Sequence, residues 1–187
     1  MPLPVAHSLL GFSLRQFQTL PLFGRTWRDV LFCVILANLP DIDFLPGLLV
    51  GNPNLHHQTY THTLGAALFV GVVGGWFFAR KYGGFWRYFL FVGLIYYSHN
   101  LLDFFNQDGR PPFGVMLFWP FSEDWFMSSR AFFSPVHKSS DSSTFFQSVF
   151  SLQNLFVAAK ELLILTPVAL VATIWRRRLN KKRFGSP

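Results

Sequence analysis

The sequence has little charge and almost no cysteine. Asp, Glu, Lys and Arg make up 13% of its 187 residues, against roughly 25% in an ordinary soluble domain. So few charged side chains cannot cover a water-facing surface, which argues against a soluble protein and favours one embedded in a bilayer. The single cysteine, Cys33, excludes an intramolecular disulfide and a thiolate-rich zinc site.

Several motifs that would indicate other functions are also missing. The sequence has no His-Glu-x-x-His of a zincin-type protease, no Gly-x-Ser-x-Gly elbow and no Walker-type loop. The net charge of +7 lies in clusters that flank apolar runs, not in one stripe with exposed aromatics, so we expect no nucleic-acid partner. We also expect no cleaved signal peptide, because no charged region, apolar stretch and small-residue cleavage site follow one another near residue 1.

Apolar residues, by contrast, are abundant at 51%, and aromatic residues reach 19%. Five segments read as helices: 4–18, 27–38, 63–79, 85–105 and 154–175. The stretch 63–79 carries no charge and is close to the length of a spanning helix. Gly71, Gly74 and Gly75 in this stretch suit close helix packing in a membrane.

The aromatic stretch 108–150 is too long to be a simple connection. We interpret it as an interfacial loop whose Phe113, Trp119, Trp125 and Phe126 contact acyl chains or form an ordinary aromatic belt. The sequence thus predicts one all-α domain over residues 1–187. It is a polytopic membrane bundle of about four to five helices with a long aromatic loop.

Basic residues form three clusters: Arg15, Arg25 and Arg28; Arg80, Lys81 and Arg87; and the tail 176–187. Because short cytoplasmic loops collect Lys and Arg, we expect all three clusters on the cytoplasmic side of a bacterial inner membrane. If the helices alternate in direction, their opposite ends gather eight His and Asp residues: His7, Asp41, Asp43, His56, His57, His62, His99 and Asp103.

Ionisable groups at membrane depth are costly and persist mainly where they pair, bind an ion or do chemistry. His99 and Asp103 stand four residues apart, which places them on one face of a helix. Asp41 and Asp43 follow Pro40 in a turn, and His57 and His62 precede an apolar helix for which Thr59 or Thr61 could be the N-cap. Taken one at a time, these motifs could equally be helix caps, ion pairs or buried structural histidines.

Together they predict a metal site towards the non-cytoplasmic face. Imidazole and carboxylate ligands without thiolate suit one or two Zn²⁺ ions, with Mn²⁺ or Fe²⁺ as alternatives. Two such ions would activate a water molecule and clamp a phosphoryl oxygen, so phosphoester hydrolysis is the reaction this set serves most naturally. The competing hypothesis is a non-enzymatic metal-binding membrane protein that handles ions or anchors a partner. The sequence does not indicate an oligomeric state.

The order of these motifs resembles the YdjM-like family of bacterial membrane-bound metal-dependent hydrolases. The matching pieces are His7-Ser8, Leu39 to Asp43, His57 to Thr63, Ser98 to Asp103 and Trp119 to Ser122. The third motif departs from the family pattern His-Arg-x-x-Thr-His-Ser, because Gln58 replaces the Arg and Thr63 the Ser. The family is also similar, in its order of His and Asp, to zinc-dependent phospholipase C.

This resemblance implies a metal-dependent hydrolase that acts on a phospholipid or a lipid-linked phosphate. It implies the metal ligands His7, Asp41, His57 or His62, His99 and Asp103. Two carboxylates are the expected catalytic residues. Asp103 would bridge two ions, and Asp43 would be a further ligand or would orient a histidine.

Overall fold

The computed structural model describes residues 1–109 and 111–184, without the side chains of 182–184, and within these residues it is helical with no β-strand. The end of the expected basic tail, residues 185–187, lies outside the described residues. The elements are α1 (Pro4–Phe17), α2 (Thr26–Asn38), the 3₁₀ helix η1 (Leu39–Asp43), α3 (Phe44–Leu49), the 3₁₀ helix η2 (Tyr60–His62), α4 (Leu64–Tyr82), α5 (Phe85–Phe104), α6 (Ser142–Val149) and α7 (Leu152–Phe184). The expected all-α bundle is confirmed.

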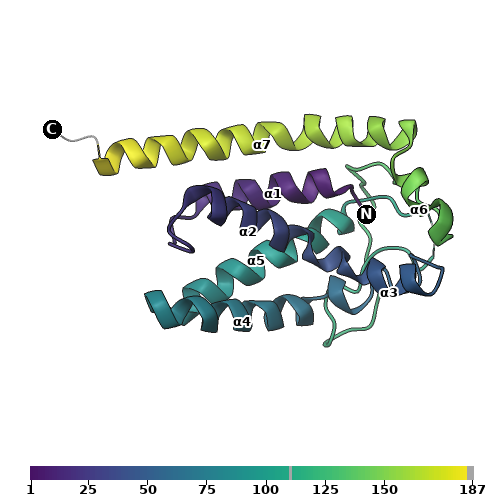
Figure 1. Cartoon of the computed structure of the whole chain (residues 1–187), viewed down its shortest axis with the longest axis horizontal. Coiled ribbons are helices and arrows are strands. Elements are labelled where there is room, and N and C mark those ends of the chain that lie inside the picture. Colours follow the sequence, from purple (N-terminus) through teal and green to yellow (C-terminus); the bar gives the residue numbers. More distant parts are fainter. Residues whose placement is uncertain (110, 185–187) are drawn as a thin grey trace.

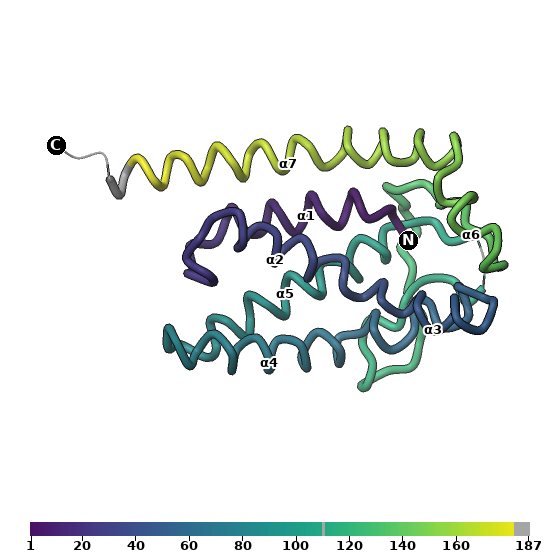
Figure 2. The backbone as a smooth tube through the Cα atoms, in the orientation of Figure 1, coloured from purple at the N-terminus to yellow at the C-terminus, as the bar shows by residue number. Residues whose placement is uncertain are grey.

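The long helices α1, α2, α4, α5 and α7 run in roughly the same direction, with α5 inclined to the others (Figure 1). Helix α7 lies along α1, which packs on α2, and the hairpin of α4 and α5 completes the bundle through contacts of α5 with α1 and α2. At one end lie α3, α6, the chain's N-terminus and the long connection from α5 to α6, as the tube in Figure 2 shows. The loop before α2, the turn between α4 and α5, and the end of α7 lie at the opposite end (Figure 1). The basic clusters and the His/Asp motifs therefore lie at opposite ends of the bundle.

Within the described part of the chain, three helical stretches are long and apolar enough to cross a bilayer: Thr26–Leu49, Leu64–Tyr82 and Leu152–Lys181, with mean hydropathies of 1.6, 1.3 and 2.0. Their outer faces carry large apolar side chains that are exposed, such as Phe69 and Trp76 on α4 and Phe156 on α7. A bilayer would cover these faces, which explains the low charge content. Helix α5 has a spanning length but is more enclosed by the other helices.

Helix α2 ends at Asn38, as expected from Pro40, but the turn expected after it is the 3₁₀ helix η1. The chain passes from α2 directly into η1 and α3, with Pro40 at the start of η1. Proline is tolerated there because its fixed φ suits a helix start and its missing N–H is not required. The N-cap of α4 also differs from expectation, because Thr63 is the residue whose side chain accepts a hydrogen bond, from the Ala66 N–H at 3.1 Å.

The glycines of α4 act as predicted, by letting α5 approach closely. A Cβ atom at Gly71 would lie 2.9 Å from the carbonyl oxygen of Phe89, and one at Gly74 would lie 2.6 Å from a methyl group of Val92. Such distances are too short for real carbon atoms, so only glycine fits at this contact. The close approach holds α5, which carries His99 and Asp103, firmly in the bundle.

At the basic end, a buried ion pair ties α1 to α2. The Arg15 guanidinium donates to Asp29 Oδ2 at 2.6 Å, and the backbone N–H of Phe23 donates to Asp29 Oδ1 at 2.9 Å. Arg15 also donates to the carbonyl of Gln18, so the loop between the two helices is held from both sides. Arg15, which we expected in a basic cluster on the cytoplasmic side, is therefore buried, whereas Arg25 and Arg28 are exposed.

Candidate metal centre

The site is built from elements that are far apart in the sequence. Helix α1 supplies His7, and η1 supplies Asp41 and Asp43. The loop before η2 supplies His57 and η2 itself supplies His62, while α5 supplies His99 and Asp103. The ligands predicted from the sequence therefore all meet: His7, Asp41, His57, His62, His99 and Asp103, together with Asp43.

The centre of the cluster is the approach of His62 to His99. Their Nε2 atoms lie 3.1 Å apart, and both lie 3.5 Å from Asp103 Oδ2. Asp41 Oδ1 lies 3.5 Å from His62 Nε2 and 3.4 Å from His99 Nε2. Two imidazoles and two carboxylates thus direct their donor atoms at a common point.

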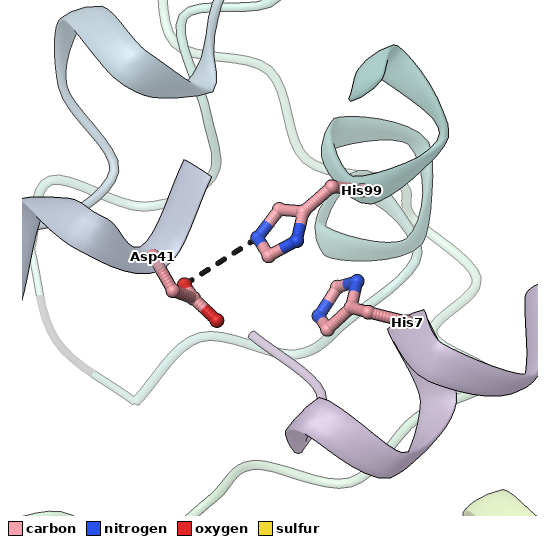
Figure 3. Close-up of side chains that lie close together, drawn as sticks. All are labelled: His7, Asp41 and His99. Atoms are coloured by element: carbon pink, nitrogen blue, oxygen red, sulfur yellow. Dashed lines mark ion pairs between the residues drawn. The ribbon is translucent and has the colours of Figure 1, made fainter. Parts of the chain in front are cut away.

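His7 completes this side of the cluster. Its ring stacks on that of His99, with centroids 3.7 Å apart and planes 14° apart, and its Nε2 lies 3.7 Å from Asp103 Oδ1. Figure 3 shows His7, Asp41 and His99 converging from α1, η1 and α5. Four residues of the cluster are fully buried: His7, His62, His99 and Asp103.

Hydrogen bonds to the other ring nitrogens fix the orientation of the histidines. His99 Nδ1 lies 2.8 Å from the carbonyl oxygen of Ala37, which can only accept, so Nδ1 carries a proton and the Nε2 of the neutral ring keeps its lone pair. Asp43 orients two further rings in this way. Its Oδ1 lies 3.0 Å from His57 Nδ1, and its Oδ2 lies 3.1 Å from His62 Nδ1. Metal-binding histidines typically have such a partner for the second nitrogen.

Asp43 is itself held in place. Its Oδ2 accepts hydrogen bonds from the backbone N–H of Gln58 at 3.0 Å and from the Thr61 hydroxyl at 2.9 Å. Of the two roles expected for Asp43, this geometry favours the orienting one. Asp103 lies at the centre of the cluster, in contact with three of its histidines.

Burial and neighbouring charges set the protonation of His57 and His62, the two histidines of the cluster that lie outside the long helices. Burial lowers the pKa of His57 from 6.5 to about 4, and the charge of Lys138 adds to this effect, so the ring is neutral at pH 7. For His62, burial opposes the charged form, but Asp41 and Asp43 outweigh it and raise the pKa above 6.5. A bound cation would compete for these carboxylates and displace the proton from His62.

Unpaired polar atoms test whether a metal ion fits these residues. Buried atoms of the cluster without a hydrogen-bond partner are both ring nitrogens of His7, Asp41 Oδ1, His57 Nε2 and both carboxylate oxygens of Asp103. Buried polar atoms without a partner are rare, and a buried carboxylate without one is costly. Three groups have ligand atoms within 4.8 Å of one another: His7 with Asp41 and His99, Asp41 with His57 and His62, and His62 with His99 and Asp103. The residues fit one or two divalent ions.

His56, which the sequence could not distinguish from its neighbours, is exposed and belongs to none of these groups. Two other residues next to the cluster were not predicted from the sequence. Phe44 stacks on His57 with ring centroids 3.9 Å apart, and Lys138 Nζ lies 5.0 Å from the centroid of Phe44. No pattern in the sequence identified Lys138, because it lies in the long loop, where periodicity carries no information.

If Asp43 orients two ligands, its substitution should weaken metal binding without abolishing it. We expect Asp43→Asn to raise the dissociation constant for Zn²⁺ about 10- to 100-fold, because His57 and His62 lose their charged partner. Competition with a chromogenic chelator measures this constant. Asp124→Asn changes an exposed carboxylate and is the control. Equal zinc affinity in Asp43→Asn and the wild type would contradict the orienting role.

Comparison with known proteins supports the assignment made from the motifs. The family model described as YdjM inner membrane protein matches residues 1–183. Searches of curated proteins and of solved structures found no match. The similarity to phospholipase C stays a prediction. The matched region covers nearly the whole chain, including all the His and Asp residues of the cluster, and the chain therefore belongs to the YdjM inner membrane protein family.

Proposed function

We propose that this inner membrane protein is a metal-dependent hydrolase, a phosphoesterase whose substrate is a phospholipid or a lipid-linked phosphate. The observation that supports the proposal most is the buried convergence of His and Asp donors with unpaired ligand atoms. A purely structural ion-pair network would be expected to satisfy these atoms internally. Both oxygens of Asp103 and both ring nitrogens of His7 have no hydrogen-bond partner.

The proposed ligands are His7, Asp41, His57, His62, His99 and Asp103, and Zn²⁺ suits them, with Mn²⁺ or Fe²⁺ as alternatives. A bound ion would supply Lewis acidity to a phosphoryl oxygen and would activate water. The chain's own residues prepare the site: Asp43 and the Ala37 carbonyl hold the histidines in one tautomer, and the bundle excludes bulk water from their rings.

The position of the cluster in the bundle supports a lipid substrate. The His/Asp residues lie near one end of the bundle, at the end of α5 and next to the long aromatic loop. That loop carries exposed Phe113 and Phe121, which could contact acyl chains. With the basic clusters at the opposite, cytoplasmic end, we place the site towards the non-cytoplasmic face.

The test uses the full chain purified in detergent. Elemental mass spectrometry gives its bound metal, and release of phosphate from short-chain phosphatidate and from a polyprenyl phosphate gives its activity. We expect metal-dependent hydrolysis of at least one of them, lowered at least about 100-fold in Asp103→Asn. Folded wild type that binds no metal even after reconstitution would refute the hydrolase. Metal binding without hydrolysis of either lipid would favour the non-enzymatic metal-binding protein instead.

A further inference from the structure

A small cavity beside the metal centre is lined by polar side chains outside the proposed ligand set, and two of them, Gln58 and Lys138, are suited to bind an anion. Its volume is about 240 Å³, and Gln58, Lys138, Asn106 and Asp108 are among the residues that line it. Gln58 follows His57 directly, and its backbone N–H donates to Asp43. The cavity therefore adjoins the residues that orient the histidines.

Gln58 is the first of these two side chains. Its φ is +63°, which is uncommon for a residue other than glycine and often marks a functional position. The residue is 8% exposed, and its side-chain Nε2 donor has no hydrogen-bond partner. A buried amide donor that lines a cavity in this way requires an acceptor, such as an oxygen atom of a bound molecule.

Lys138 is the second. Its ammonium group lies over the Phe44 ring, which in turn stacks on His57. Its charge is close enough to interact with Asp41, Asp103 and Asp43, so it lies beside the metal centre. Burial lowers the pKa of Lys138 to about 8, opposed by these carboxylates, and the side chain is therefore mostly charged at pH 7.

The carboxylate of Asp108 also lines the cavity and would repel an anion if it were unpaired. It lies 3.3 Å from the N-terminal ammonium group of Met1 and accepts a hydrogen bond from the Gly114 N–H at 2.8 Å. These partners offset its charge. The lining of the cavity therefore includes Lys138 and the Gln58 amide, while the Asp108 carboxylate is already paired with Met1 and Gly114.

We propose that Lys138 and Gln58 form a phosphate-binding subsite beside the metal centre, which holds an anionic oxygen of the substrate. This rests on the proposed function, because it assigns these residues to the substrate of that site. Lysine binds phosphate as a point charge, and a neutral amide adds a directed hydrogen bond. Phe44 fixes the lysine through a cation–π contact, so the charge is positioned before the substrate arrives.

The test measures phosphate binding and metal content separately on the full chain in detergent. The probes are inorganic phosphate and dihexanoyl phosphatidate, followed by calorimetry, and metal content is followed by elemental mass spectrometry. We expect Lys138→Met to weaken binding about tenfold or more, Gln58→Leu about threefold to tenfold, and neither to change the bound metal. Lys138→Arg should keep most of the affinity, because it keeps the charge.

Lys160→Met is the matched control, because Lys160 is exposed and its ammonium group contacts Ser134 on the surface. Melting temperatures verify that each variant is folded. Tighter binding of phosphatidate than of inorganic phosphate would assign the subsite to a lipid headgroup, and the reverse would assign it to a soluble phosphate. The subsite would be overturned if Lys138→Met bound each probe as tightly as the wild type does. It would also be overturned if the wild type bound neither probe. If the proposed metal centre alone is wrong, the wild type will contain no metal in the elemental analysis.

Discussion

His99→Ala and Asp103→Ala should each abolish stoichiometric metal binding, while His56→Ala should leave it unchanged. His99 Nε2 and the Asp103 carboxylate lie at the centre of the cluster, within 3.5 Å of each other, so removing either side chain leaves the other ligands without their common partner. His56 is the control, because it is a nearby histidine that is exposed and lies outside the cluster. Elemental mass spectrometry of the three variants gives the comparison directly.

The thermal stability of the same variants separates a metal centre from a structural ion-pair network. A ligand that binds only the folded state at 100 times its dissociation constant stabilises that state by about 2.7 kcal/mol. We therefore expect a chelator to lower the melting temperature of wild type and of His56→Ala, and to leave Asp103→Ala unchanged.

In the chelated proteins, Asp103→Ala should be at least as stable as wild type, because it removes a buried carboxylate that has no hydrogen-bond partner. A structural network predicts the opposite, namely that Asp103→Ala is less stable than wild type whether or not a chelator is present. That result, with no effect of the chelator on wild type, would refute the metal centre.

The second large effect is expected at the other end of the bundle. Arg15→Met should destabilise the protein by about 3–5 kcal/mol, because it leaves Asp29 charged, buried and without its guanidinium partner. It also removes the hydrogen bond to Gln18 that helps to close the loop between α1 and α2. Denaturation in mixed micelles measures the difference in unfolding free energy.

Two further variants test the reason for this loss. Arg28→Met removes an exposed arginine and should change the stability by no more than about 0.5 kcal/mol. The double variant Arg15→Met/Asp29→Leu removes both charges, and should recover much of the lost stability because no unpaired charge remains. If the double variant is no more stable than Arg15→Met, the loss comes from packing and not from the buried charge.

The sequence by itself determined the class of the protein and its helices. Low charge and long apolar runs indicate a membrane bundle whatever the details of packing, because only a bilayer makes such a surface favourable. The expected segments correspond to α1, α2, α4, α5 and α7, with the main difference in the length of α7. The pairing of His99 with Asp103 was also predictable, because a spacing of four residues fixes a shared helix face.

Only the tertiary structure decided which of these residues meet. The loop before η2 folds against η1, where Asp43 contacts His57 and Gln58. This fold brings His57 and His62 into the cluster and leaves His56 outside it. The burial of Arg15 and the position of Lys138 over Phe44 are likewise contacts between distant parts of the chain. Local periodicity specifies the face of a helix but not its neighbour. The partners of these side chains are therefore fixed by packing between helices and loops, which no short stretch of sequence encodes.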